Sequence, residues 1–418
     1  MNTPKIRFKG FEDDWEQRKL GTLCSLITKG TTPKDKSGNG EVNFIKVENI
    51  NPDNGEITVL SKISTEEHER YLKRSKLEED DVLFSIAGTL GRVSVVKSNV
   101  LPANTNQAIA IIRVKKGYIP YLTTVLKGPA VEDFIRKNPT IGAQPNLSLE
   151  QVNNLDISYP KYEEQVKIGE YFKSLDNLIT LHQRKCDETK QLKKFMLQKM
   201  FPKNGEKNPE IRFKGFTDDW EQRKLEDVMD TVTDYVAAGS FEDIRNNVTY
   251  LNEPGYAQLV RTVDLKKKFT NSDSVYVDES AFKYLWRVNL NDECIVLPNI
   301  GANIGEVYFV EPSGLPYDNN VLGPNAILLK ANEDTYFAFT ALNNLTFQKQ
   351  LFENVGSSGQ PKFNKTELKS IQLYMPQNEE QVKIGQYFRK LDHLITLHQR
   401  KCEKLKELKK FMLQNMFV

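Results

Sequence analysis

The feature that most constrains this chain is a long segment that occurs twice. Residues 160–202 read PKYEEQVKIGEYFKSLDNLITLHQRKCDETKQLKKFMLQKMFP, and residues 376–418 read PQNEEQVKIGQYFRKLDHLITLHQRKCEKLKELKKFMLQNMFV. Aligned without a gap at an offset of 216 residues, the copies are identical at 31 of 43 positions. A shorter segment, IRFKGFEDDWEQRKL at Ile6–Leu20, returns as IRFKGFTDDWEQRKL at Ile211–Leu225. Repeated sequence folds as repeated structure, so we expect two copies of one architecture.

The blocks between the repeats differ in length and in most side chains. Gly21–Tyr159 has 139 residues and Glu226–Met375 has 150 residues. A chain of 418 residues is too long for one hydrophobic core. We therefore expect a first α/β domain over residues 1–160, a helix with its linker over 161–205, a second α/β domain over 206–376 and a second helix over 377–418.

Each copy of the long repeat is predicted to form one helix. Between Glu163 and Met200 there is no proline and a single glycine, and the opening EEQ suits the positive end of a helix dipole. Apolar or small residues recur at steps of three and four, as in a coiled-coil seam. The seam positions are Phe172, Leu175, Ile179, His182 and Cys186 in the first copy and Phe388, Leu391, Ile395, His398 and Cys402 in the second. A seam needs a partner helix, so we expect the two copies to pack as an antiparallel coiled coil.

An alternative gives part of the seam a chemical role. His182 and Cys186 are four residues apart, as are His398 and Cys402, so two helices could supply four zinc ligands. Structural zinc sites usually carry a close-spaced cysteine pair on a turn, which these helices lack. We therefore favour packing and predict no metal site.

The blocks between the repeats read as strands, turns and helices in one common order. Runs rich in Val, Ile and Phe, bounded by glycine-rich turns, indicate strands. The first block has strands at Val42–Val47, Val82–Ile86, Val93–Val96 and Ala108–Val114, then helices at Ile119–Lys127 and Ala130–Lys137. The second has strands at Tyr256–Val260, Glu293–Leu297, Glu306–Val310 and Asn325–Leu329, then helices from Tyr336 onward and at Phe347–Asn354. The predicted fold class is α/β (α+β), with two similar domains in an internal pseudo-two-fold repeat.

Composition and cysteine usage narrow the class of protein. A hydrophobic content of 39% and a charged content of 27% are typical of a globular protein. The N-terminal residues lack the apolar core of a signal peptide, so we expect a cytoplasmic location, with Cys24, Cys186, Cys294 and Cys402 as free thiols. The net charge of +2 argues against an indiscriminate nucleic-acid coat, so phosphate attraction has to come from local patches or from a partner subunit.

The doubled motifs resemble those of one family. The paired EEQVKIG…LDxLITLHQRK segments, the paired WEQRKL segments and the GQPN and GQPK passages before each helix are similar to those of specificity (S) subunits of type I restriction–modification systems. The resemblance covers essentially all 418 residues. It implies two target-recognition domains that each bind one half of a split DNA site, with the long helices as the spacer. It also implies that the chain is not an enzyme.

The same resemblance implies a set of partners. These are double-stranded DNA, two modification (adenine methyltransferase) subunits and restriction/translocase subunits, with no membrane partner. S-adenosylmethionine, ATP and Mg are then expected on the partner subunits, and no cofactor is expected in this chain.

The residues themselves favour the absence of catalysis. The sequence has no GxxxxGK[ST] loop, no GxGxxG turn after a strand, and no Asn- or Asp-Pro-Pro-aromatic motif for a flipped adenine. Two other functions stay open: a divergent methyltransferase or nuclease with its own active site, and a coiled-coil adaptor that reads no DNA. The two elaborate and unlike blocks argue against the adaptor, because a spacer needs no such loops.

Side chains that contact DNA are predicted to lie in the loops of the two blocks. Arg and Lys suit guanine, Asn and Gln suit adenine, and Lys, Arg, Ser and Thr suit phosphates. In the first block the candidates are Lys29, Thr31, Lys34, Lys36, Thr89, Arg92, Asn104, Asn106, Gln107, Gln144 and Asn146. In the second they are Arg261, Lys266, Lys267, Lys268, Asn299, Asn303, Asn319, Asn320, Ser357, Gln360 and Lys362. Such residues also form ordinary turns, and the corresponding Gln144 and Gln360 are expected to share a structural role.

The three tryptophans are expected to be structural. Trp15 and Trp220 occupy equivalent repeat positions and are predicted to anchor the WEQRKL segments on their domains. Trp286, which occurs in the second block alone, is expected to lie in a core.

Overall fold

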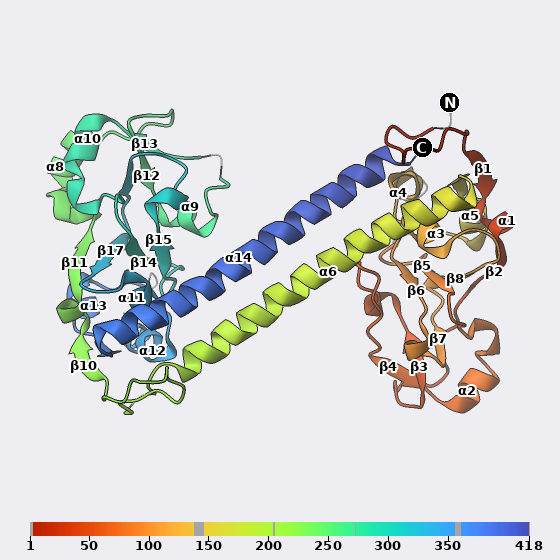
Figure 1. The fold of residues 1–418 in the computed structure, drawn as a ribbon, viewed down its shortest axis with the longest axis horizontal. Helices are drawn as coiled ribbons and strands as arrows, with labels where there is room; N and C mark the ends of the chain where they lie inside the picture. The colour runs from red at the N-terminus through yellow and green to blue at the C-terminus, as the bar shows by residue number, and fades with distance from the viewer. Residues whose placement is uncertain (1–2, 138–145, 204, 272, 356–360, 418) are drawn as a thin grey trace. The chain divides into compact units, whose positions relative to one another are not determined.

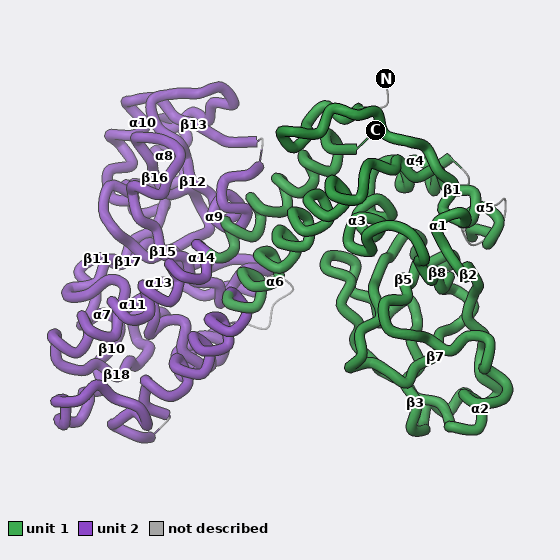
Figure 2. Tube along the Cα trace, turned by 45° about the vertical axis from the view of Figure 1, so that its right-hand side comes forward, with its two compact units in different colours: residues 1–185, 398–418 green, residues 186–397 purple. Residues whose placement is uncertain are grey.

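The computed structural model describes residues 3–137, 146–203, 205–271, 273–355 and 361–417. Figure 1 shows the elements, and Figure 2 colours the two compact units into which the chain divides. Unit 1 comprises residues 1–185 and 398–418, and unit 2 comprises residues 186–397. Each unit therefore combines one of the two unlike blocks with parts of both long helices.

The described residues of unit 1 form a four-stranded sheet, a three-stranded sheet and five short α-helices before the long helix. The strands of its sheets are β2 (Cys24–Lys29), β3 (Val42–Ile45), β4 (Ser61–Ile63), β5 (Val82–Ser85), β6 (Val93–Val95), β7 (Ala103–Thr105) and β8 (Ile109–Val114). The helices are α1 (Leu20–Leu23), α2 (Thr65–Glu69), α3 (Ile119–Leu126), α4 (Pro129–Lys137) and α5 (Leu149–Asn153). An antiparallel sheet has the order β2-β8-β5-β6, and a smaller sheet has the order β4-β3-β7, in which β3 and β7 are parallel (Figure 1).

Unit 2 repeats this topology. Its strands are β11 (Met229–Asp234), β12 (Ala257–Val260), β13 (Tyr276–Val277), β14 (Cys294–Pro298), β15 (Tyr308–Val310), β16 (Asn320–Leu322) and β17 (Ala326–Ala331). Its helices are α7 (Leu225–Val228), α8 (Phe241–Asn247), α9 (Thr262–Lys266), α10 (Glu279–Tyr284), α11 (Thr335–Leu342), α12 (Leu345–Glu353) and α13 (Lys365–Lys369). The sheet orders are β11-β17-β14-β15 and β13-β12-β16, with β12 and β16 parallel. The strands and helices expected in both blocks are present, with ends within two residues of the expected ones, and the mixed α/β fold with its internal repeat is confirmed.

The WEQRKL segments form strands that the sequence did not indicate. β1 (Glu16–Lys19) pairs antiparallel with β9 (Asp156–Tyr159), and β10 (Glu221–Lys224) pairs antiparallel with β18 (Gln372–Met375). The residues EQRK are polar and mostly exposed, so they carry no alternation of apolar side chains. Each pairing joins the start of a block to the strand that leads into its long helix.

The long helices α6 (Tyr162–Lys199) and α14 (Asn378–Asn415) pair antiparallel inside each unit, as expected. In unit 1, Lys409 Nζ is 2.5 Å from Asp176 Oδ1. In unit 2, the equivalent Lys193 Nζ is 2.6 Å from Asp392 Oδ1. The seam residues that are buried are Phe172, Leu175, Ile179, Cys186, Phe388, Leu391 and Cys402, whereas His182, Ile395 and His398 are half-buried.

The end of α14 closes the core of unit 1. The ring centroid of Phe417 lies 6.2 Å from that of Trp15, 5.9 Å from that of Tyr121 and 5.8 Å from that of Phe172. Trp15 is buried, and its Nε1 donates a hydrogen bond of 3.2 Å to Glu164 Oε2. The core of the first block is thus completed by Phe417, which follows α14.

The end of α6 closes the core of unit 2 in the same way. The ring centroid of Phe201 lies 5.7 Å from that of Trp220, 5.7 Å from that of Phe337 and 6.2 Å from that of Phe388. Trp220 is as deeply buried as its counterpart in unit 1. Each domain core therefore depends on the long helix of the other repeat.

Candidate nucleic-acid interface

In unit 1 the loops with the candidate side chains lie side by side at one end of the larger sheet. Gly30 N–H donates to Ile109 O (3.2 Å), and Ile86 N–H donates to Ala108 O (2.8 Å). Leu147 N–H in turn donates to Ile86 O (2.8 Å). The structure thereby joins the chain after β2, the turn between β5 and β6, the chain between β7 and β8, and the segment before α5.

Gly30 permits the closest of these approaches. A Cβ atom at this position would lie 2.1 Å from Thr105 O and 2.2 Å from Asn106 O. No side chain fits at that distance from backbone atoms, so glycine is required where β2 leaves the sheet.

Most candidates in unit 1 reach the surface of these loops. Lys34 places its ammonium 4.6 Å from the ring centroid of Tyr71, and Thr32 hydrogen-bonds Gln107. The exposed candidates are Lys29, Lys34, Lys36, Thr89, Gln107 and Asn146, and the half-buried ones are Thr31, Arg92 and Asn106. Gln144 lies outside the described residues.

Among the described candidates of unit 1, Asn104 is the one that the structure places inside the protein. It is fully buried, its Oδ1 is 2.5 Å from His68 Nδ1, and its Nδ2 donates to Leu72 O (2.9 Å) and Ser75 Oγ (3.2 Å). These contacts engage the amide in the packing of β7, away from any surface. The local sequence NTNQ is compatible both with an asparagine that contacts DNA and with one that packs inside the domain. Only the fold distinguishes these two roles.

Arg92 also has bonds within the domain. Its guanidinium donates from one nitrogen to Val47 O (3.0 Å) and Ile50 O (2.8 Å). These bonds fix the turn after β3 against the β5–β6 turn. Arg92 thus braces the loop surface in this conformation.

In unit 2 the equivalent loops meet in the same way. Gly301 N–H donates to Pro361 O (2.9 Å), Phe363 N–H to Asn299 O (3.1 Å) and Asn299 N–H to Asn325 O (3.2 Å). The turn after β14, the chain before β17 and the segment before α13 therefore share one surface. The two domains present their loops from matching ends of matching sheets.

The candidates of unit 2 differ in how freely they reach solvent. Arg261 donates to both carboxylate oxygens of the buried Asp264 (2.8 and 3.0 Å), and this bond raises the pKa of Arg261 above its usual value. Lys266 Nζ donates to Asn303 Oδ1 (2.7 Å) and Glu306 Oε1 (2.6 Å). The exposed candidates are Lys266, Lys267, Lys268 and Lys362, the half-buried ones are Arg261, Asn299, Asn303 and Asn319, and Asn320 is buried. Ser357 and Gln360 lie outside the described residues.

The expectation that Trp286 lies in a core is wrong. Its side chain is 63% exposed, and the Arg287 guanidinium lies 5.2 Å from its ring centroid. Val288, two residues later on the same turn, points inward and is buried instead. Residue type alone favoured burial of the tryptophan, because the sequence does not show which side of so short a turn faces the sheet.

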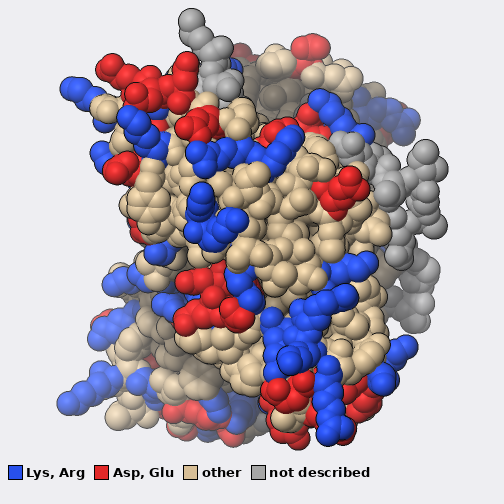
Figure 3. Space-filling model, turned by 90° about the vertical axis from the view of Figure 1, so that its right-hand side faces the viewer, with Lys and Arg blue, Asp and Glu red and all other residues tan. Residues whose placement is uncertain are grey.

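On the face that it draws, Figure 3 shows charged side chains of both signs in small groups, with uncharged surface between them. Among the described residues on that face, lysine and arginine side chains are interspersed with aspartate and glutamate side chains. Across the described ranges, no helix is long and apolar enough to cross a membrane. Within the same ranges, no three His, Cys, Asp or Glu side chains gather as a metal site requires.

Comparison with known proteins decides the family. The sequence profile of the type I restriction modification DNA specificity domain matches the chain twice, over residues 12–191 and 217–407. The chain belongs to this family. It is a type I restriction–modification specificity subunit with two target-recognition domains, one in each unit.

Related specificity subunits are similar over much of this one. The chain is 22% identical over 415 residues to the type I restriction enzyme MjaVIII specificity subunit of Methanocaldococcus jannaschii, and this match covers 95% of this chain and 91% of that protein. It is 29% identical over 178 residues to the type I restriction enzyme EcoBI specificity subunit of Escherichia coli, and this match covers 40% of this chain and 36% of that protein. The crystal structure of a type I restriction–modification S subunit from M. genitalium has the same fold, with a TM-score of 0.64, 14% identity, and coverage of 100% of this chain and 99% of that chain.

Proposed function

We propose that this specificity subunit reads a DNA sequence in two parts, one half with each target-recognition domain. The observation that carries the proposal is that both domains share one strand topology but carry different side chains on the loops at the same end. Base readout depends on loop side chains, so one scaffold with two loop sets suits two different half-sites. The paired long helices act as the spacer that sets the gap between the half-sites.

Methylome sequencing of a host that expresses the chain with its modification subunit tests this proposal. We expect a methylated adenine in a split motif with a gap of fixed length. Exchange of the block Gly21–Tyr159 for that of another family member should change one half of the motif and keep the other. A stable complex that adds no methylation would instead favour an adaptor that reads no DNA.

We further propose that two modification subunits dock on the repeated helix surfaces. Leu192 and Phe195 on α6 are 45% and 48% exposed, and their equivalents Leu408 and Phe411 on α14 are 41% and 52% exposed. Exposed apolar side chains at equivalent positions of two helices form two similar surfaces, and clustered exposed apolar groups favour protein contact. Two similar surfaces suit two copies of one partner.

Native mass spectrometry of the reconstituted complex tests the docking. The double variant Leu192→Glu/Phe195→Glu should reduce the count of modification subunits from two to one, and Leu408→Glu/Phe411→Glu should do the same. Leu60→Glu, at a position that is exposed and lies outside both helices, is the matched control and should leave the count at two. Saturation of the unmodified chain by a single modification subunit would contradict the proposal.

The chemistry is proposed to belong to the partners. S-adenosylmethionine then acts on the modification subunits, and ATP with Mg acts on the restriction/translocase subunits. The missing nucleotide and adenine motifs of this chain support that division. The purified chain alone should transfer no methyl group from S-adenosylmethionine to DNA, and measurable transfer would favour the divergent methyltransferase.

A further inference from the structure

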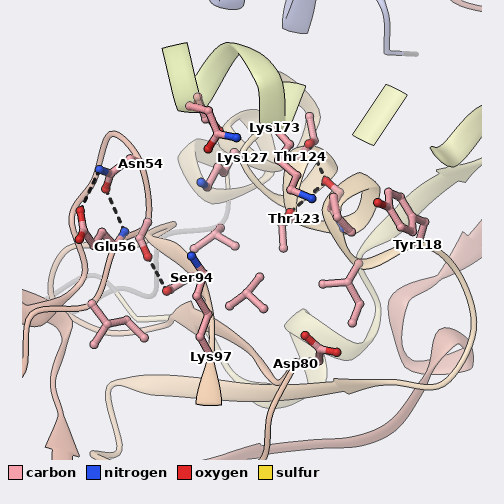
Figure 4. Close-up of a pocket in the computed structure, with 18 of the residues that line it drawn as sticks. Asn54, Glu56, Asp80, Ser94, Lys97, Tyr118, Thr123, Thr124, Lys127 and Lys173 are labelled. Carbon is pink, nitrogen blue, oxygen red and sulfur yellow. Dashed lines mark hydrogen bonds between the residues drawn. The ribbon is translucent and has the colours of Figure 1, made fainter. Parts of the chain in front are cut away.

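Unit 1 contains a cavity beside the first part of α6. It has a volume of about 790 Å³ and is lined by residues of β6, α3, α6 and the loop at residues 54–57 (Figure 4). Val95 and Pro120 contribute apolar surface, and Lys127 and Lys173 contribute ammonium groups. The volume lies within the range of about 300–1,000 Å³ that is typical of small-ligand sites.

Three positions on this wall carry small side chains where unit 2 carries aromatic rings. The pairings of β5 with β6 and β8 match those of β14 with β15 and β17. Helices α3 and α11 have equal lengths, and Tyr121 and Phe337 at their third positions both pack on the tryptophan of their unit. The equivalent pairs are Val95 and Phe309, Pro120 and Tyr336, and Thr123 and Phe339.

In unit 2 these rings pack on one another beneath a cation. The centroid distances are 4.7 Å from Phe309 to Tyr336, 5.3 Å from Tyr336 to Phe339 and 5.6 Å from Phe309 to Phe339. The Arg389 guanidinium lies 5.2 Å from the Phe309 centroid and 4.8 Å from the Tyr336 centroid, and it pairs with Glu293 at 2.7 Å. This backbone framework therefore accommodates planar rings under a positive charge.

In unit 1 the cation is kept while the rings are replaced. Lys173 occupies the position of Arg389, 216 residues earlier, and it lines the cavity that the smaller side chains leave. Lys97 extends along the same wall beside Ser94 (Figure 4). The space that side chains fill in unit 2 is thus open and bordered by lysines in unit 1.

Lys127 is the half-buried one among the lysines of the cavity wall, to which Glu56, Asp80 and Asp176 contribute carboxylates. The ammonium is half-buried and, within the described residues, takes part in no hydrogen bond or ion pair of the domain. Burial lowers the pKa of Lys127, and the nearby Asp176, which pairs with Lys409 at 2.5 Å, opposes that effect. A half-buried ammonium without a bonded anion carries a desolvation cost, and a bound acidic group would relieve that cost.

We propose that this cavity binds a small planar ring that carries an acidic group, a phosphate or a carboxylate. The ring lies against Val95, Pro120 and Thr123 with Lys173 over its face, and the acidic group is held by Lys127. None of the lining residues is a candidate DNA contact, so the site is independent of the proposed reading of DNA.

Saturation-transfer NMR and calorimetry on the full chain test the site with two acidic probes, adenosine 5′-monophosphate and indole-3-acetate, and with neutral adenosine. We expect at least one acidic probe to bind saturably, and adenosine to bind at least about tenfold more weakly than its monophosphate, because the charged contact is lost. Saturation by neither acidic probe up to about 10 mM, or equal binding of adenosine and its monophosphate, would overturn the proposal.

Two variants locate the binding. Val95→Phe/Thr123→Phe copies the side chains of unit 2 into unit 1 and should abolish binding while the circular-dichroism spectrum is kept. Lys127→Met should weaken binding about tenfold. This variant still tests the site if Val95→Phe/Thr123→Phe does not fold. Lys62→Met removes an equal charge from an exposed position on β4 and should change nothing. Unchanged affinity in both cavity variants would place the ligand elsewhere and refute the assignment.

Discussion

His182 and His398 face each other, with their Nδ1 atoms 3.0 Å apart and their ring centroids 5.2 Å apart. The two residues are 216 positions apart and are therefore the same position of the long repeat. At this separation one Nδ1 has to carry the proton and the other has to accept it. A pair of imidazolium ions would place two N–H groups and two charges against each other.

Acid should therefore destabilise the protein through this pair. Burial, followed by His398, Lys401 and Lys185, lowers the pKa of His182 below its usual 6.5. His182 in the unfolded chain therefore binds a proton more readily than in the folded chain. As a result, this pair leaves the free energy of unfolding undiminished above about pH 6.5 and lowers it as the pH drops below that value. Thermal melts between about pH 5.5 and 8 measure this fall.

Variants of the pair give the control. His398→Gln should reduce the pH dependence of the melting temperature, because His182 loses the imidazole opposite it, while burial, the larger cause, remains. His393→Gln, at an exposed position of α14, should leave the dependence as it is. An unchanged dependence in His398→Gln would show that other groups cause it.

Removal of the ring of Phe201 should destabilise the second domain. The ring is buried against Trp220 and Phe337, and loss of a buried phenyl ring costs about 3–5 kcal/mol of unfolding free energy. Phe195→Ala, on an exposed position of α6, should change it by less than about 0.5 kcal/mol. Urea unfolding of both variants measures the difference, and equal effects would contradict the packing role of Phe201.

Arg7 should be essential to the anchoring of the first domain on α6. Its guanidinium donates to both carboxylate oxygens of Glu164 (2.7 and 2.9 Å), and Glu164 is 1% exposed. Arg7→Met leaves that carboxylate buried without a cation and should cost about 3–5 kcal/mol of unfolding free energy.

A double variant separates the buried charge from lost packing. Arg7→Met/Glu164→Leu should be more stable than Arg7→Met, because no unpaired carboxylate remains. Lys161→Met, which breaks the exposed pair with Asp13, should have little effect on stability. A double variant less stable than Arg7→Met, measured by urea unfolding, would contradict the unpaired carboxylate as the cause of the loss.

Asn104→Ala should affect folding first. The buried amide bonds His68, Leu72 and Ser75, and its loss leaves those groups without partners at a cost of about 1–3 kcal/mol. Gln107→Ala, on an exposed loop position three residues later, should change the unfolding free energy by less than about 0.5 kcal/mol. Equal stability of both variants would mean that the contacts of Asn104 contribute nothing.

Lys29→Ala should affect DNA binding and leave stability unchanged. The side chain is exposed where β2 joins the loop surface, and a phosphate contact there adds affinity without sequence preference. We expect weaker binding of all DNA by the assembled complex, with the slope of log affinity against log salt reduced by about one. Lys116→Ala, exposed beyond the other end of the same sheet, is the control, and an equal loss in both variants would contradict the prediction.

The sequence by itself determined the repeat, and the repeat determined much of the fold. Two identical WEQRKL segments and two similar helical segments are expected to adopt the same local structure in both halves of the chain. The seam of α6 and α14 requires a partner helix. The strands of the blocks were also predictable, because runs rich in β-branched and aromatic residues between turns are a local property of the chain. Mixed α/β domains with paired antiparallel helices follow from these signals.

Only the tertiary structure decided how single residues are used. Asn104 is buried while Gln107 is exposed, Trp286 faces solvent while Trp15 is covered by Phe417, and the cavity beside Lys127 exists because Val95 and Thr123 replace aromatic rings. Each outcome depends on which distant segment packs over the residue. The contact of Trp15 with Phe417 joins positions that lie almost the whole chain apart, and no local pattern of residues encodes so remote a neighbour.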